Sequence, residues 1–261
     1  MTDVRDLYHI AEAILDDVER LFIQGIGSAP TTFKNGGDFV TDMDLKIEQY
    51  LRTQLVMMTG IPVFGEEYGG KLETPMWVVD PIDGTANYAA GNPMSSILIS
   101  LIADGEPVIG LTSVPMVGQR FGAYADSPLL LNGQVQPQMS ARDQRHVSHV
   151  GFTSIASPRE SSFPTVVRQG LLGALAQTYL RPRITGSVGI DLAYAAAGIF
   201  DAALSLSPNL WDNAAGIMLV RAAGGVVTDL DGNQWTPTSE GVIVGSARSH
   251  EVLMATIDTM R

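Results

Sequence analysis

Residues 77–88 read Trp77-Val-Val-Asp-Pro-Ile-Asp-Gly-Thr-Ala-Asn-Tyr88, and this stretch carries a buried strand directly into two carboxylates. Asp80 and Asp83 are three residues apart with a proline in the turn between them, so both side chains can point into one crevice. Two carboxylates in one crevice repel each other unless a cation lies beside them. Mg²⁺ suits such a site because it accepts carboxylates and carbonyls while keeping waters and substrate phosphates. A purely structural turn is the alternative.

Three further acidic positions accompany this stretch, and each also has an ordinary structural explanation. Glu66 and Glu67 follow a short apolar run, where adjacent glutamates usually lie in a solvated loop. Asp212 begins a helical pattern, where an aspartate most often caps the helix. Asp44 has the same default role at the start of an earlier helical pattern.

Apolar periodicity predicts helices followed by strands in the first part of the chain. Positions at spacings of three and four predict one helix over residues 4–22, and a second helix follows with Thr41 or Asp42 as its cap. Asn132-Gly133 predicts a hairpin turn. Four short runs rich in branched residues predict strands at 61–64, 77–79, 97–102 and 108–114.

The predicted secondary structure changes beyond about residue 145, where longer helical segments alternate with short strands. The predicted helices there span 163–178, 189–200 and 212–223. The fold class is therefore α/β, with an α+β N-terminal lobe at residues 1–145 that carries most of the candidate metal ligands. An α/β C-terminal lobe at residues 146–261 carries Asp212 and, by the resemblance described next, the substrate-side contacts.

The order and spacing of these motifs resemble the magnesium-dependent, lithium-sensitive phosphomonoesterases of the inositol monophosphatase family. The resemblance extends over almost the whole chain and implies a sugar-phosphatase fold, layered αβαβα, with a metal cleft between the lobes. The segments that carry it are Lys34, Val40-Thr-Asp-Met-Asp44, Glu66, Asp80-x-x-Asp83-Gly-Thr85, Gly186-Ser187, Trp211-Asp212-x-Ala-x-Gly216, Ala223-Gly-Gly225 and Gly232.

The resemblance implies two or three Mg²⁺ ions as cofactors. Their implied ligands are Glu66, Asp80, the backbone carbonyl of Ile82, Asp83 and Asp212, with Asp80 bridging two ions. Two cations about 4 Å apart can clamp a phosphate, activate a water and stabilise the leaving oxygen of an in-line displacement. No covalent phosphoenzyme is then needed.

The resemblance also implies catalytic and substrate-binding residues. Thr85 and Asp44 correspond to a dyad that orients or deprotonates the attacking water, with Glu66 as a third catalytic residue. Backbone N–H groups of Gly84 and Thr85 at a helix start would hold phosphate oxygens. The implied substrate contacts are Asp83, Gly84, Thr85, Gly186, Ser187 and Asp212.

The expected reaction is hydrolysis of inositol 1-phosphate to myo-inositol and phosphate. Many family members have a glutamate for the inositol hydroxyls seven residues before the position of Asp212, and here this residue is Ser205. Histidinol phosphate, fructose 1,6-bisphosphate and 3′-phosphoadenosine 5′-phosphate therefore stay open as substrates. Glu67 is expected to affect a water molecule of a weaker third metal site. Arg183 either binds a second anionic group of the substrate or is a solvated surface residue.

A non-catalytic phosphate-binding regulator is the rival hypothesis from another class. The presence of Asp44 and Thr85 beside the metal carboxylates argues against it, because a protein that had lost its catalytic activity would be free to lose this dyad first.

The sequence also supports two predictions about single positions. Met57-Met58 is expected to pack in the core, and Asp83→Asn is expected to abolish activity with a near-intact fold because the crevice is exposed.

The composition of the chain limits the classes of molecule that it is expected to bind. With 45% hydrophobic and 17% charged residues the chain is a folded one, and the absence of cysteine excludes disulfides and thiolate sites. The net charge of −12 disfavours nucleic acid and anionic membranes, although two or three divalent ions would reverse the sign locally for a small phosphorylated substrate. No signal-peptide pattern is present, so a cytoplasmic protein is expected, and the resemblance implies a homodimer.

Overall fold

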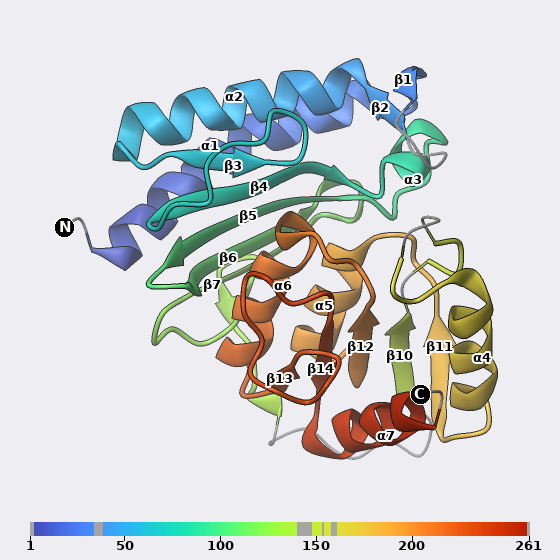
Figure 1. Ribbon diagram of the computed structural model, residues 1–261. Helices are drawn as coiled ribbons and strands as arrows, with labels where there is room; N and C mark the ends of the chain where they lie inside the picture. The colour runs from blue at the N-terminus through green and yellow to red at the C-terminus, as the bar shows by residue number, and fades with distance from the viewer. Residues whose placement is uncertain (1–2, 34–38, 140–147, 153, 158–160, 260–261) are drawn as a thin grey trace.

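Helices and sheets alternate in five layers, as Figure 1 shows for the computed structural model. The structure describes residues 3–33, 39–139, 148–152, 154–157 and 161–259. In order, the three helical layers are α1 (Val4–Gly25) with α2 (Asp42–Thr59), α5 (Val188–Ala197) with α6 (Leu210–Ala222), and α4 (Thr165–Leu175) with α7 (Ala247–Asp258). This order confirms the predicted αβαβα layering.

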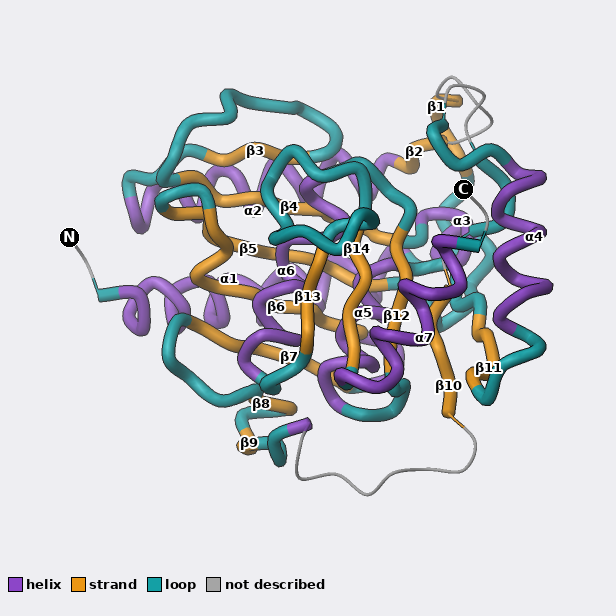
Figure 2. The backbone as a smooth tube through the Cα atoms, turned by 60° about the horizontal axis from the view of Figure 1, so that its bottom comes forward, coloured by secondary structure: helices purple, strands orange, loops and turns teal. Residues whose placement is uncertain are grey.

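A seven-stranded sheet lies between the α1–α2 layer and the α5–α6 layer. Its neighbouring strands are antiparallel except β3 and β4, which run parallel. From one edge to the other, its strands are β3 (Val63–Gly65), β4 (Met76–Asp83), β5 (Ser96–Ala103), β6 (Glu106–Val114), β7 (Gln119–Tyr124), β8 (Leu130–Leu131) and β9 (Gln134–Val135). The rotated view in Figure 2 shows them succeeding one another across the molecule.

A five-stranded sheet lies between the α5–α6 layer and the α4–α7 layer. Strand β10 runs parallel to both β11 and β12, whereas β14 is antiparallel to β12 and β13. In spatial order, its strands are β11 (Leu180–Arg183), β10 (Ser148–Phe152), β12 (Ala202–Ser205), β14 (Val242–Gly245) and β13 (Val226–Thr228), which are side by side in Figure 2.

The remaining described elements are short. A two-stranded ribbon pairs β1 (Pro30–Phe33) with β2 (Phe39–Thr41), directly before α2. The helix α3 (Thr85–Ala89) follows β4, and the 3₁₀ turn η1 (Pro115–Val117) follows β6. Asn132 and Gly133 both have positive φ and join β8 to β9, which confirms the predicted hairpin.

Strand β4 is longer than the sequence predicts. The apolar run ends at Val79, but pairing with β5 continues from Asp80, opposite Leu98, to Asp83, opposite Ser96. Three steps along β4 thus match two along β5, which is the geometry of a β-bulge. The strand was expected to end at Val79, and the structure instead has a bulge there, flanked by Asp80 and Asp83.

The helix α2 confirms one local prediction and corrects another. Thr41 caps it, because the Thr41 hydroxyl accepts a hydrogen bond from the Met43 N–H. The prediction that Met57-Met58 packs in the core is wrong, since these side chains are 66% and 55% exposed. The buried stripe of the helix ends at Leu55, before the last turn, so the two methionines extend past the surface that covers it.

The α5–α6 layer packs against both sheets. Alternating residues of β4 show this arrangement, because Trp77 and Val79 pack with α1 and α2 whereas Met76 and Val78 pack with α5 and α6. The cluster around α5 and α6 also includes Val242 and Val244 from the second sheet in the sequence. The expected lobe boundary between residues 145 and 146 falls outside the described residues, as does Lys34.

Candidate active site

The bulge of β4 brings Asp80 and Asp83 into the interior of the protein. Both are buried, and all residues of β4 share this burial. Asp80 Oδ1 accepts a hydrogen bond of 3.0 Å from the N–H of Ile82, which closes the bulge locally. In Figure 1, the end of β4, the start of α2 and the short helix α3 lie at the same end of the molecule.

Asp83 joins the end of β4 to the start of α5. Its Oδ2 accepts hydrogen bonds from the Ser96 hydroxyl at 2.8 Å, the Gly189 N–H at 2.8 Å and the Ser187 hydroxyl. Its Oδ1 accepts one longer bond, 3.1 Å, from the Val188 N–H. Asp83 is only 6% exposed, so the premise that it lies in an exposed crevice is wrong.

This environment changes the expectation for Asp83→Asn. An asparagine amide cannot accept all of these hydrogen bonds, and its NH₂ group would face donors instead. Leaving a buried donor without an acceptor costs about 1–3 kcal/mol. The expectation of a near-intact fold is therefore replaced by loss of stability together with loss of activity.

Asp80 lies among other carboxylates rather than among cations. Its pKa is raised well above the ordinary value, first by burial and then by the charges of Glu66, Asp83, Asp212 and Asp44. Repulsion of this kind shows that the chain brings acids from four separate segments into one region. The structure thus brings Asp44, Glu66, Asp80, Asp83 and Asp212 into one region, although most of them lie far apart in the sequence.

Asp212 lies in the first turn of α6, where Asn209, not Asp212, is the N-cap. Asp212 Oδ2 accepts hydrogen bonds from the Ser207 hydroxyl and from Asn209 Nδ2, the latter at 3.3 Å. Burial, followed by the charge of Asp83, raises the pKa of Asp212 to about 7. The structure thus replaces the default capping role with a side chain turned toward the other acids.

Two aromatic rings connect the start of α6 to β3. The ring centroids of Phe64 and Trp211 are 5.7 Å apart. Phe64 lies in the strand that ends just before Glu66, and Trp211 directly precedes Asp212. This contact explains how two acidic residues almost 150 positions apart in the sequence come to share one region.

Asp44 and Thr85 are in contact, as the resemblance predicts for the dyad. The Thr85 hydroxyl lies 3.4 Å from Asp44 Oδ1 and donates a shorter bond of 3.0 Å to the Ile82 carbonyl. Asp44 Oδ2 accepts from the Thr41 N–H and hydroxyl in a capping box. Burial is the main reason why the pKa of Asp44 is raised to about 6.

The two glycine-containing segments chosen as substrate contacts touch each other. Gly84, at φ 84°, is the N-cap of α3, and a Cβ there would meet the Gly186 carbonyl at 2.9 Å. Gly186 also has positive φ, and Asn87 Nδ2 donates to the neighbouring Thr185 carbonyl at 2.8 Å. A side chain at Gly84 would prevent the two backbones from lying this close together, and both residues have a positive φ, which explains why both are glycines.

Ser205, which stands at the position of the usual inositol-binding glutamate, is buried. It is 2% exposed at the end of β12, and its hydroxyl accepts a bond of 3.3 Å from the Ser207 N–H. The polar residues of the following loop, Ser207 and Asn209, instead turn toward Asp212. Arg183 donates to the Pro182 carbonyl at 2.9 Å from an exposed position.

In each of three aspartates, one carboxylate oxygen accepts at most one hydrogen bond from the described residues. Asp80 Oδ2 and Asp212 Oδ1 receive no hydrogen bond from the described residues, and Asp83 Oδ1 receives only the 3.1 Å bond. Oxygen donors with mutually raised pKa values suit a hard divalent cation. Within the described residues, however, no three acidic, His or Cys side chains already form a single-ion cluster.

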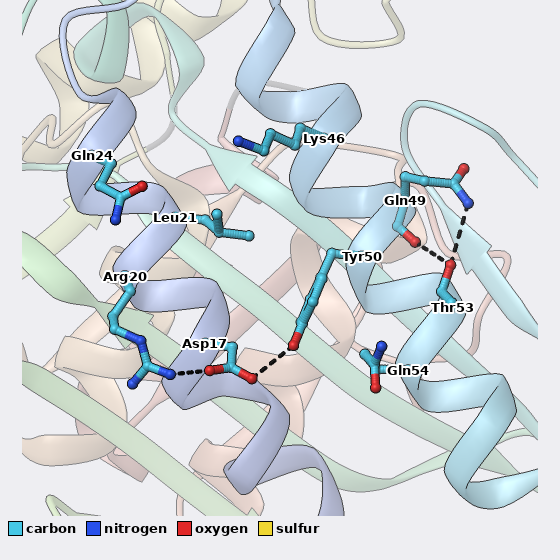
Figure 3. A pocket seen from close by; sticks show the side chains of 9 residues that line it. All are labelled: Asp17, Arg20, Leu21, Gln24, Lys46, Gln49, Tyr50, Thr53 and Gln54. Carbon is cyan, nitrogen blue, oxygen red and sulfur yellow. Dashed lines mark hydrogen bonds and ion pairs between the residues drawn. The ribbon is translucent and has the colours of Figure 1, made fainter.

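A groove of about 580 Å³ lies between α1 and α2 (Figure 3). Tyr50 donates to Asp17 across it at 2.7 Å, and Asp17 also pairs with Arg20. None of the candidate catalytic or ligand residues lines it. The Tyr50–Asp17 hydrogen bond therefore ties α1 to α2, whereas the Asp17–Arg20 ion pair lies within α1.

No helix in the described ranges is both long enough and apolar enough to cross a membrane.

Comparisons with known proteins agree on one family. The profile of the inositol monophosphatase family matches residues 4–260. A protein of Mycobacterium tuberculosis named probable inositol 1-monophosphatase ImpA is 44% identical over 253 residues, covering 96% of this chain and 93% of its own length. The inositol-1-monophosphatase ImpA of Mycolicibacterium smegmatis is 43% identical, covering 94% and 89%.

A solved structure shows the same fold. The IMPase of Thermotoga maritima superposes with a TM-score of 0.82 at 24% identity, over 94% of this chain and 93% of that chain.

Proposed function

Because this chain belongs to the inositol monophosphatase family and is a phosphoric monoester hydrolase, we propose that it hydrolyses inositol 1-phosphate in a Mg²⁺-dependent reaction. The products are myo-inositol and phosphate. One observation carries the metal dependence: Asp44, Glu66, Asp83 and Asp212 all raise the pKa of the buried Asp80. A folded protein tolerates such a cluster when a divalent cation neutralises it.

The proposed ligands of two or three Mg²⁺ ions are Glu66, Asp80, the Ile82 carbonyl, Asp83 and Asp212. Hydrogen bonds from Ile82 and Asn209 hold one oxygen of Asp80 and one of Asp212, and the other oxygen of each would bind a cation. Asp83 Oδ1 would bind a cation beside the 3.1 Å bond that it accepts from the Val188 N–H. Bound Mg²⁺ would neutralise the phosphate charge and lower the pKa of a coordinated water. Pre-oriented ligand oxygens of this kind strengthen metal binding.

The dyad would act on the proton of the attacking water. The Thr85 hydroxyl can accept that proton while it passes its own to Asp44, whose carboxylate lies 3.4 Å away. Asp44 is the acceptor at the end of this relay, and burial raises its pKa to about 6 in the metal-free protein. Glu66, the third proposed catalytic residue, would act as a metal ligand beside this water.

The remaining contacts would position the phosphate ester. The N–H groups of Gly84 and Thr85 are at the start of α3 and would bind phosphate oxygens. Asp83, Gly186, Ser187 and Asp212 would contact the alcohol portion. Ser207 and Asn209, which follow Ser205 in the chain and hydrogen-bond to Asp212, would supply further polar groups on this side.

Phosphate release from four esters tests the substrate assignment. Inositol 1-phosphate is expected to give the highest kcat/KM, ahead of histidinol phosphate, fructose 1,6-bisphosphate and 3′-phosphoadenosine 5′-phosphate. Lithium is expected to inhibit the reaction. A higher kcat/KM for any of the other three would transfer the assignment to that ester, and release from none of them would favour the non-catalytic regulator.

The buried carboxylates predict a specific pH dependence of stability for the metal-free protein. The pKa is raised to about 6 for Asp44 and to about 7 for Asp212, whereas aspartate in an unfolded chain titrates near 3.9. Between about pH 4 and 7 the folded protein therefore binds more protons than the unfolded chain, so its stability falls as the pH rises.

Mg²⁺ favours the ionised carboxylates and should offset this loss. We expect added Mg²⁺ to raise the melting temperature more near pH 8 than near pH 5, since protons compete with the metal at the lower pH. Thermal unfolding with EDTA and with Mg²⁺ at both pH values measures the effect. Equal increases at the two pH values would contradict it.

The expected assembly follows from the family resemblance, and the expected location follows from the sequence analysis. We propose a homodimer in the cytoplasm, which sedimentation of the purified protein and cell fractionation can test.

A further inference from the structure

Helix α2 presents three charged residues at intervals of four, namely Asp44, Glu48 and Arg52. This spacing places them along one side of the helix. Asp44 contacts Thr85, as described above, whereas the reaction scheme uses neither Glu48 nor Arg52. Glu48 is fully buried, which is rare for a glutamate unless its charge is compensated.

The Glu48 carboxylate accepts two backbone N–H groups from the turn that follows Glu66. Its Oε2 accepts from the Glu67 N–H at 2.6 Å, and its Oε1 accepts from the Tyr68 N–H at 3.0 Å. Hydrogen bonds to an ionised acceptor are about twice as strong as bonds between neutral groups. The side chain therefore fixes the backbone immediately after Glu66.

Arg52 completes the hold on this turn. Its Nη2 donates to Glu48 Oε1 at 2.9 Å and to the Gly69 carbonyl at 2.7 Å, and its Nη1 donates to the Val63 carbonyl at 2.6 Å. Glu48 and Arg52 thus contact the backbone on both sides of Glu66, in β3 before it and in the turn after it. Gly65 fits this arrangement because a Cβ there would collide with the Glu48 carboxylate.

We propose that Glu48, supported by Arg52, is a positioning residue that holds the Glu66–Gly69 turn so that Glu66 faces Asp80 as a metal ligand. The proposal deepens the proposed function and rests on it for the role of Glu66. Glu48 acts through the backbone of Glu67 and Tyr68 and touches neither metal nor substrate. Because Asp44 lies one turn earlier on α2, the same helix sets the dyad and the ligand turn relative to each other.

Glu48→Gln is the direct test. Both carboxylate oxygens accept N–H groups, and an amide of the same size can satisfy only one of them. We expect the Mg²⁺ concentration for half-maximal activity to rise about 10- to 100-fold, the range for residues that orient ligands. Turnover at saturating Mg²⁺ and KM for the ester should stay within about threefold, because the reacting groups remain.

Two readouts do not depend on turnover. Calorimetric titration with Mg²⁺ in the absence of any ester should show the same loss of affinity. Hydrogen exchange at the Glu67 and Tyr68 amides should become faster in the metal-free variant, because one of them loses its acceptor. These readouts distinguish the two proposals: a wild-type protein that binds Mg²⁺ but hydrolyses no ester refutes the proposed function and leaves the positioning role standing.

Glu19→Gln is the matched control. Glu19 on α1 pairs with Arg120 at 2.7 Å and accepts from the Ser113 hydroxyl at 2.5 Å, so it loses an ion pair of similar kind away from the ligand turn. We expect it to lower the melting temperature without changing Mg²⁺ affinity. Gly65→Ala is the second variant; it crowds the Glu48 carboxylate without altering any charge and should weaken Mg²⁺ binding as Glu48→Gln does.

Three results would overturn the positioning role. One is Mg²⁺ affinity within twofold of wild type in Glu48→Gln. The second is an equal loss of affinity in Glu48→Gln and Glu19→Gln, which would mean that general destabilisation is the cause. The third is a wild-type protein that binds no Mg²⁺. If Glu48→Gln does not fold, wild-type affinity in Gly65→Ala overturns the proposal and a loss of affinity there supports it.

Discussion

Asp80→Asn is expected to abolish turnover and to raise the melting temperature of the metal-free protein. Asp80 is 1% exposed, and four other acids raise its pKa. An asparagine carries no charge at any pH, so the variant avoids the repulsion that an ionised Asp80 meets in the absence of metal, while the asparagine oxygen can still accept the bond from the Ile82 N–H. The same change removes the ligand proposed to bridge two ions.

The loss of turnover should be on the order of 10³-fold or more, because a bound metal contributes several kcal/mol of transition-state stabilisation. Thermal unfolding in EDTA and phosphate release in Mg²⁺ measure the two effects. Asp258→Asn, which makes the same charge change at an exposed position on α7, should leave both values near wild type.

The opposite directions of the two effects make the variant informative. If Asp80 were only part of a structural turn, its replacement would lower stability and spare much of the activity. A lower melting temperature in EDTA combined with turnover near that of wild type would therefore refute the metal assignment.

Thr85→Ala should lower kcat by about 10²- to 10⁴-fold, the range for loss of general acid–base catalysis. The Thr85 hydroxyl lies between the Ile82 carbonyl and Asp44, at 3.0 and 3.4 Å. The backbone N–H of residue 85, which is proposed to bind phosphate, is kept in the variant. KM should therefore change by less than about threefold.

Thr85→Ser is the matched control, since it keeps the hydroxyl and removes only a methyl group. Steady-state kinetics at saturating Mg²⁺ should give it most of the wild-type kcat. An effect of Thr85→Ala confined to KM would instead assign this residue to substrate binding.

Much of the fold can be predicted from local pattern. The apolar stripe of α1, the Thr41 cap and the Asn132-Gly133 hairpin depend on neighbours within a few residues, and the structure confirms all three. Periodicity fails where tertiary contacts decide. It does not anticipate that pairing with β5 extends β4 through a bulge to Asp83, or that Met57 lies beyond the core.

The acidic residues of the candidate site can be selected from spacing and family resemblance, and their roles stay predictions. Their surroundings cannot be selected in this way, because they come from distant segments. Ser96 on β5 and Ser187 before α5 meet on Asp83, and Ser207 reaches Asp212. Glu48 had a detectable signal, since it lies three residues before Leu51 and seven before Leu55, on the side of α2 where the apolar residues are buried and a glutamate is unexpected.

Phosphate release by the EDTA-treated wild-type protein, measured as Mg²⁺ is added back, tests the central claim most directly. The claim is that the buried acids around Asp80 form a Mg²⁺ site at which a phosphate monoester is hydrolysed. It predicts no release of phosphate from inositol 1-phosphate without metal, and release that rises with calorimetrically measured Mg²⁺ binding. Release at the full rate in EDTA would contradict it.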